Sequence, residues 1–171
     1  MTFLELSKSR YSTRLYQDKP VAREDLEKIL EAGRIAPTAK NLQPFTIYVL
    51  SSEEALHKVD QLTACRYNAP LVLLIGYDRT KPYIYPEEHI LFDSGIEDCA
   101  IVMTHMMLEA TELGLNTCWI NKFSPIEAKR FFGFDGDFIP VAMLDVGYEA
   151  EHRIARLHDE SKTIDELVKV L

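Results

Sequence analysis

Two short segments near the N-terminus carry residue types that could bind a charged ring cofactor. The first, Arg10-Tyr11-Ser12-Thr13-Arg14, places two guanidinium groups and two short hydroxyl side chains within five residues. Such groups donate hydrogen bonds that suit a phosphate. In an extended chain Arg10, Ser12 and Arg14 would share one side, because alternate side chains point the same way. The segment therefore predicts a phosphate site, and the alternative is a solvated basic turn.

The second segment, Ala36–Phe45, lies between a helical pattern and a strand, and contains Thr38, Asn41 and Gln43. Carboxamides both donate and accept hydrogen bonds, which suits the edge of a heteroaromatic ring. The alternative is a capping loop, in which Asn and Thr satisfy nearby backbone groups. The two segments in this order predict a binding site for a phosphorylated ring cofactor.

Composition and charge exclude several classes of protein. The 171 residues include 27 Asp and Glu against 19 Lys and Arg, and the net charge is −8. This acidity argues against nucleic-acid or anionic-membrane partners, which need a basic face. The N-terminus lacks signal-peptide character, and Pro70–Gly76 is far shorter than the roughly 20 residues of a membrane span. Cys65, Cys99 and Cys118 form no C-x-x-C pair, as expected of reduced thiols in a cytoplasmic protein.

Other binding motifs are missing from the sequence. His105 and Glu109 are four residues apart in a helical pattern, but no third ligand accompanies them, so we expect no metal site. No G-x-G-x-x-G, P-loop or G-x-S-x-G motif occurs, which argues against a dedicated dinucleotide-binding half. No linker or repeat divides the chain, and we expect one domain over residues 1–171.

Hydrophobic periodicity predicts an α+β or three-layer arrangement around one sheet of about four strands. The segment 77–89 contains two prolines, Pro82 and Pro86, and no periodicity, so we predict a loop there. Expected helices are Phe3–Leu6, Arg23–Arg34, Ser51–Leu62, Phe92–Leu113 and two shorter ones that begin at Ser124 and Thr163; expected strands are Thr46–Leu50, Pro70–Gly76, Asn116–Ile120 and Ile139–Val146.

The predicted helix Phe92–Leu113 is apolar nearly all round. Such a helix is buried on every side, often in part by a second subunit. Met103, Met106 and Met107 would form a large exposed patch on a monomer. We therefore expect this helix to contribute to a dimer interface.

These segments together resemble the nitroreductase family of flavin-dependent oxidoreductases. Arg10–Arg14 is similar to the family's R-x-S-x-R/K, and Ala36–Phe45 to its A-P-S-x-x-N-x-Q-P-W, with Thr38 for Ser and Phe45 for Trp. Leu113–Ile120 resembles its L-G-L-G-T-C-W-I strand. Weaker matches are Asn68-Ala69-Pro70, Asp93–Ile96, Gly147-Tyr148 and Ile164–Val168, so the resemblance spans nearly the whole chain.

The resemblance implies a mostly antiparallel sheet of four to five strands flanked by helices, and an intertwined homodimer with two FMN sites at its interface. The first segment would hold the FMN phosphate and ribityl end, while Pro37, Thr38 and Asn41 would come from the other subunit. The main chain after Trp119 would approach the ring. A late basic residue, Lys162 or Arg156, would reach the phosphate. The cofactor-binding residues so predicted are Arg10, Tyr11, Ser12, Arg14, Pro37, Thr38, Asn41, Gln43, Ile120, Asn121, Arg156 and Lys162.

The activity implied is transfer of hydride from NADH or NADPH to FMN, and then to an electron-poor small molecule such as a nitroaromatic or quinone. Asn121-Lys122 stand where the family often has Gly, so the space over the flavin would differ. No catalytic side chain can be named from the sequence. Two alternatives stay open: a related flavin enzyme of another reaction type, such as dehalogenation or flavin breakdown, and a flavin-binding dimer with little turnover.

Overall fold

A four-stranded antiparallel sheet forms the centre of the molecule. The computed structural model describes residues 1–86, 91–152, 158 and 160–171. The strands lie in the order β1-β2-β6-β5, and every neighbouring pair is antiparallel. Their bounds are β1, Phe45–Leu50; β2, Leu71–Asp78; β5, Asn116–Ile120; and β6, Phe138–Gly147. The predicted α+β fold is confirmed.

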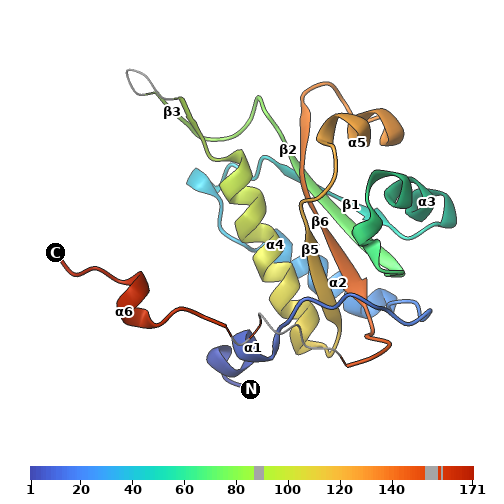
Figure 1. Ribbon diagram of the computed structural model, residues 1–171. Coiled ribbons are helices and arrows are strands. Elements are labelled where there is room, and N and C mark those ends of the chain that lie inside the picture. Colours follow the sequence, from blue (N-terminus) through green and yellow to red (C-terminus); the bar gives the residue numbers. More distant parts are fainter. Residues whose placement is uncertain (87–90, 153–157, 159) are drawn as a thin grey trace.

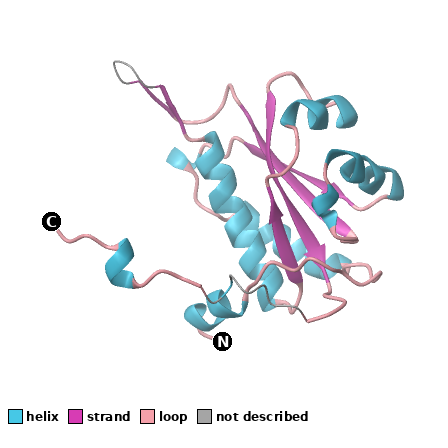
Figure 2. Ribbon diagram, in the orientation of Figure 1, coloured by secondary structure: helices cyan, strands magenta, loops and turns pink. Residues whose placement is uncertain are grey.

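Helices cover both faces of this sheet (Figure 2). Helices α2 (Arg23–Arg34) and α4 (Gly95–Glu112) pack on one face, and α3 (Glu53–Leu62) and α5 (Pro125–Phe132) on the other. The 3-10 turn η1 (Ala39–Asn41) connects α2 to β1, and the 3-10 turn η2 (Ala64–Arg66) connects α3 to β2. Strand β2 is buried on both faces, which explains its continuous apolar sequence.

Helix starts follow the capping residues of the sequence. Ser124 accepts from the Glu127 backbone N–H at 3.3 Å with Pro125 at the first helical position, as predicted. Ser52 accepts from Ala55 at 3.2 Å at the start of α3. Thr163 forms a capping box at the start of the short α6 (Ile164–Leu167).

The prediction of a loop over residues 77–89 is wrong in part. Strand β2 continues to Asp78, and β3 (Ile84–Pro86) pairs with β4 (Leu91–Asp93). The β-forming residues beside the prolines have cross-strand partners that a local pattern cannot reveal. Helix α4 begins at Gly95 rather than Phe92, because the Asp93 carboxylate accepts from the Gly95 N–H at 2.7 Å and ends the strand there.

The expectation of an exposed methionine patch is also wrong. Met103 and Met106 have no exposed surface, because they pack inside the chain between α2, α4 and the sheet. A Cβ added at Gly33 of α2 would lie 2.8 Å from the Met106 Cγ, so the helices approach closely there. The exposed apolar residues of α4 are instead Ile96 (60% exposed) and Ile101 (38%).

Both ends of the chain expose apolar side chains. Helix α1 (Phe3–Ser9) exposes Phe3 and Leu4 beside the C-terminal end of α4. Helix α6 and the residues after it extend away from the sheet (Figure 1). This C-terminal arm exposes Ile164, Leu167, Val168, Val170 and Leu171.

Candidate functional site

Residues Arg10–Arg14, hereafter the arginine segment, lie along the outer edge of β5. Ser12 forms a parallel bridge with Thr117, and the Thr13 N–H donates to the Thr117 carbonyl at 3.0 Å. Tyr11 and Thr13 are buried, whereas Arg10 and Ser12 are partly exposed and Arg14 is exposed. The chain is therefore extended here and presents the two guanidiniums and the Ser12 hydroxyl on its outer side, as predicted.

The two guanidiniums of this segment have no carboxylate partner among the residues that the structure describes. Arg14 makes one long hydrogen bond, from Nη1 to the Ser12 carbonyl at 3.4 Å. Other arginines pair with acids, as Arg23 does with Glu27 at 2.7 Å. In a chain rich in acid, two unpaired guanidiniums beside a hydroxyl form a donor set that fits a phosphate group.

Tyr11 anchors this segment rather than facing outward. Its hydroxyl donates to the Glu149 carboxylate, lies 3.2 Å from His152 Nδ1, and accepts from Asn116 Nδ2 at 3.4 Å. Burial and the Glu149 carboxylate raise the pKa of Tyr11 to about 12. The Tyr11 hydroxyl is thus engaged within the chain, and its contact with a cofactor stays a prediction.

The end of β5 offers main-chain groups. The Ile120 side chain is 3% exposed and lies in the core, so only its backbone could reach a ligand. Asn121 is exposed, but its Oδ1 accepts from Trp119 Nε1 at 2.8 Å. This bond fixes the turn after the strand.

Sequence reasoning missed the turn at Cys65, which lies between the arginine segment and the end of β5. Hydrogen bonds from the Tyr67 and Thr63 side chains lower the pKa of the partly exposed Cys65 thiol, and the nearby charges of Lys122 and Arg14 lower it further. Tyr67 has a left-handed backbone, with φ 53°. The Tyr-Asn pair before Ala-Pro was the only available signal of this turn.

Residues Thr38–Gln43, hereafter the carboxamide loop, occupy a different part of the molecule. The Ala39 N–H donates to Asp98 Oδ1 at 2.8 Å, and Asp98 lies near the start of α4. Asn41 and Gln43 are exposed, Thr38 is partly exposed, and Pro37 precedes them at the surface.

The two predicted binding segments lie near opposite ends of α4 (Figure 1). The carboxamide loop adjoins its N-terminal end, whereas the arginine segment contacts Asn116, just beyond its C-terminal end. An 18-residue helix is about 27 Å long at 1.5 Å per residue. A single chain therefore does not bring the two segments together.

The two late basic residues predicted to reach the phosphate stay untested. Arg156 lies outside the described residues. Lys162 is exposed in the extended stretch before α6, and His158 Nε2 lies 3.3 Å from the Lys8 carbonyl, so the connection passes the end of α1. The role of Lys162 stays a prediction.

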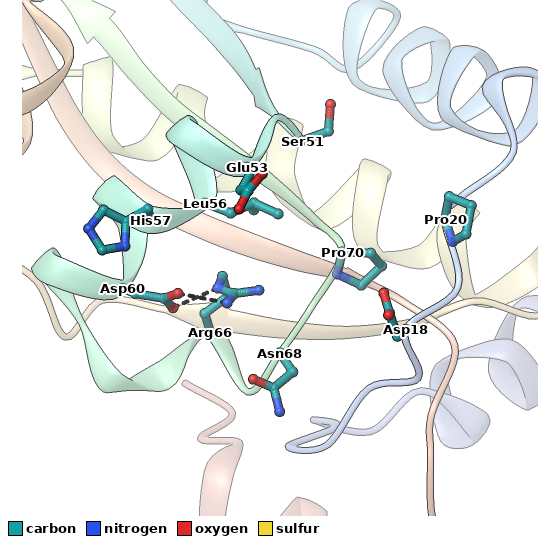
Figure 3. A pocket seen from close by; sticks show the side chains of 10 residues that line it. All are labelled: Asp18, Pro20, Ser51, Glu53, Leu56, His57, Asp60, Arg66, Asn68 and Pro70. Atoms are coloured by element: carbon teal, nitrogen blue, oxygen red, sulfur yellow. Dashed lines mark hydrogen bonds and ion pairs between the residues drawn. The ribbon is translucent and has the colours of Figure 1, made fainter.

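A polar hollow of about 470 Å³ lies elsewhere, beside α3 (Figure 3). Among the described residues, none of those predicted to bind the cofactor lines it. Its Arg66 guanidinium donates to both Asp60 oxygens at 2.6 and 2.7 Å and to the Ala69 carbonyl at 2.8 Å. With these donors engaged, the described lining of the hollow offers no free guanidinium or ammonium for a phosphate.

The described residues contain neither a metal-binding cluster nor a membrane-spanning helix. Within that part of the chain, no three His, Cys, Asp or Glu side chains lie close enough to hold a metal ion. No helix there is both long and apolar enough to cross a membrane.

Comparison with known proteins decides the family. The sequence profile of the nitroreductase family matches residues 7–67 and 65–148, which include the arginine segment, the carboxamide loop and the whole sheet. The chain belongs to the nitroreductase family. The resemblance stated from its motifs is thereby confirmed.

Several members of this nitroreductase family are similar to the chain over most of its length. The crystal structure of a nitroreductase family protein from Clostridium difficile 630 is 37% identical, with a TM-score of 0.92 over 99% of this chain and 98% of that one. A protein described as an FMN-dependent nitroreductase from Clostridium difficile R20291 is 27% identical, with a TM-score of 0.83 over 98% of each chain. An FMN reductase [NAD(P)H] from Bacillus subtilis is 28% identical over 82% of this chain and 63% of its own length.

Proposed function

We propose that the protein is an FMN-dependent oxidoreductase that takes hydride from NADH or NADPH and reduces an electron-poor small molecule, such as a nitroaromatic or a quinone. The observation that carries this proposal is the pair of unpaired guanidiniums, Arg10 and Arg14, beside Ser12 at the sheet edge. FMN is favoured over FAD because no second motif suits an adenine half. The names of the relatives from Bacillus subtilis and Clostridium difficile R20291 support the same cofactor.

We further propose a homodimer in which each flavin site is shared. One chain supplies the arginine segment and the end of β5, and its partner supplies Pro37, Thr38, Asn41 and Gln43. The separation of the two segments along α4 supports this arrangement, because a second, antiparallel copy of α4 would bring the start of one helix to the end of the other.

Exposed apolar surface also supports the dimer. Ile96 and Ile101 face outward from α4, and the C-terminal arm exposes five apolar residues with no core beneath them. An arm that exposes this many apolar side chains is typical of an interaction site in a soluble protein. A second copy of the chain would cover both features.

In this site the protein's own residues would bind FMN and orient it. FMN, when bound, supplies the hydride chemistry, since flavins carry the redox step. Arg10 and Arg14 would neutralise the phosphate, and the main chain at Ile120 and Asn121 would border the ring. Tyr11, whose pKa is raised to about 12, stays protonated at neutral pH and cannot act as a base.

Purification of the protein tests the proposal in three steps. A yellow preparation whose released cofactor has the mass of FMN supports it, whereas FAD or no flavin would overturn it. Anaerobic bleaching by NADH or NADPH then separates an enzyme from a flavin-binding dimer with little turnover. Reoxidation by a nitroaromatic or quinone identifies the acceptor class. If the flavin is bleached but the reduced protein then dehalogenates a substrate or breaks down flavin, the protein is a flavin enzyme of that other reaction type.

We also propose a cytoplasmic location with neither nucleic acid nor membrane as a partner. The three cysteines are free thiols, as reducing conditions would leave them. The net charge of −8 disfavours anionic partners.

A further inference from the structure

The carboxamide loop holds a costly backbone conformation. Lys40, Asn41 and Gln43 have φ values of 50°, 55° and 48°, in the left-handed region. This region is unfavourable for residues with a Cβ, less so for Asn than for Lys or Gln, and such backbone strain clusters at ligand sites. A contact from outside the loop would offset this cost.

The side chain of Asp98 is placed to do this. It is 1% exposed, and its Oδ1 accepts the Ala39 N–H at 2.8 Å. The loop's other hydrogen bonds are internal, such as that from the Gln43 N–H to Thr38 Oγ1 at 3.1 Å. Among the hydrogen bonds of the described residues, the Asp98 contact is the one that ties this loop to α4.

The second oxygen of Asp98 extends the contact to another segment. Oδ2 accepts the Ser94 hydroxyl at 2.8 Å, and Ser94 Oγ in turn accepts the Tyr83 N–H at 3.1 Å. The Lys40 ammonium lies 4.4 Å from the centre of the Tyr83 ring, which closes the connection back to the loop. One buried carboxylate thus joins the loop, the start of α4 and the segment before β3.

Helix α4 lacks a side-chain N-cap, because its N-cap residue is used in the Asp98 hydrogen bonds. Ser94 is its N-cap residue, yet its side chain makes no capping hydrogen bond and donates to Asp98 instead. A buried carboxylate is costly unless each oxygen is satisfied, and here both are. The helix N-terminus adds a favourable field for the negative charge.

We propose that Asp98 is a positioning residue, which fixes the backbone of the carboxamide loop so that Thr38 and Asn41 meet the flavin of the partner subunit. This inference rests on the proposed function. Asp98 would not itself touch the flavin, because it lies beneath the loop and is buried. Its loss would release the strained loop while the arginine segment stays intact.

The test compares Asp98→Ala, Asp98→Asn and the control Glu97→Gln. Glu97 is an exposed acid in the same helical turn, so its variant removes a similar charge without touching the loop. Asn keeps an acceptor for Ala39, and its amide can donate to the Ser94 oxygen. We expect FMN affinity to fall at least tenfold in Asp98→Ala, to recover most of the way in Asp98→Asn, and to be unchanged in Glu97→Gln.

The visible circular dichroism of the bound flavin at saturating FMN separates positioning from general destabilisation. With every site filled, Asp98→Ala should still alter the flavin bands, and Asp98→Asn should restore them. Parental affinity and parental bands in Asp98→Ala would overturn the inference while FMN binding by the parent stands. The inference is also wrong if affinity falls only in step with the dimer fraction. If Asp98→Ala does not fold, Asp98→Ser carries the same test, because its hydroxyl stands one bond short of the oxygen that accepts the Ala39 N–H, and parental affinity and parental flavin bands in that variant would overturn the inference.

Discussion

The arginine segment and the carboxamide loop are held in different ways. The arginine segment is an extended strand paired through backbone to β5, so its fold depends little on the side chains that it presents. The carboxamide loop is a strained turn that depends on one buried carboxylate. Ordinary backbone pairing thus supports the charged half of the site, whereas the ring-facing half requires a dedicated support.

This difference predicts how each half responds to mutation. The two arginine side chains of this segment can be removed with little effect on folding, because Arg14 is exposed and Arg10 partly so. Changes in the carboxamide loop alter side chain and backbone together. The halves also lie near opposite ends of α4, so anything that separates two copies of the chain should destroy the site while leaving each half intact.

The largest effect is expected from Ile101→Asp. Ile101 is 38% exposed in the middle of α4, and a dimer interface there would bury the new charge at a cost of several kcal/mol. We expect a folded monomer of 19.6 kDa that has lost FMN. Light scattering combined with flavin absorbance measures both.

The matched control for this variant is Ile126→Asp. Ile126 is 78% exposed on α5, across the sheet from α4, so this variant should stay dimeric and yellow. A monomeric Ile101→Asp that still holds FMN would refute the shared site. Met106→Asp is unsuitable for this purpose, because Met106 is fully buried and its change would unfold the chain.

The next effect concerns the arginine segment alone. Arg10→Ala or Arg14→Ala removes a charge-assisted contact to phosphate worth about 1.5–3 kcal/mol, so FMN affinity should fall roughly ten- to a hundredfold. Thermal stability without flavin should not change. Fluorescence titration with FMN measures the affinity, and Arg23→Ala, on a 90% exposed side chain, is the control. Parental affinity in both variants would remove the phosphate assignment.

A smaller effect is expected at Asn41, where two substitutions separate side chain from backbone. Asn41→Gly removes the carboxamide but accepts φ 55° freely, so FMN affinity should fall by about 0.5–1.5 kcal/mol with little change in stability. Asn41→Ala should show the same loss and cost a further 1–2 kcal/mol or so of backbone strain. Equal FMN affinity in parent and Asn41→Gly would argue that this carboxamide does not reach the ring.

The sequence predicted elements whose signals are local. Alternation in Arg10–Arg14, the apolar run of β2 and the Ser124-Pro125 helix start each depend on a few adjacent residues, and each agrees with the structure. The family motifs made the whole fold predictable as well, because they are distributed along nearly the whole chain.

Features that depend on distant residues escaped prediction. The β3–β4 pairing needs partners that local periodicity does not show, and the burial of Met103 and Met106 depends on the approach of α2. The role of Asp98 depends on a contact with Ala39, 59 residues away in sequence. Exposed Ile96 and Ile101 could not be distinguished from their buried neighbours, because α4 is apolar on several sides.

A second buried aspartate, Asp145 on β6, lies near Arg66 and contrasts with Asp98. Asp145 is completely buried, and neither of its oxygens has a hydrogen-bond partner among the described residues. Burial raises the pKa of Asp145 to about 9, against the opposing charge of Arg66. Asp145 should therefore be protonated and neutral at pH 7.

The smallest effect on flavin binding, and a clear effect on stability, is expected from Asp145→Asn. The folded state keeps the proton up to about pH 9, whereas the unfolded chain loses it near its ordinary pKa of 3.8. The stabilising contribution of Asp145 to the free energy of unfolding is therefore fully present below pH 3.8. It decreases as the pH rises from there toward 9, by at most roughly 1.4 kcal/mol per pH unit. The neutral Asn side chain removes this dependence, so the variant should gain stability over the parent as pH rises from 5 to 8, with unchanged FMN affinity. Denaturant unfolding at fixed protein concentration measures the difference, with the exposed Asp18→Asn as the control. Parallel stability curves for parent and Asp145→Asn would mean that Asp145 is ionised in the folded protein, and that Arg66 is the cation that balances this buried charge.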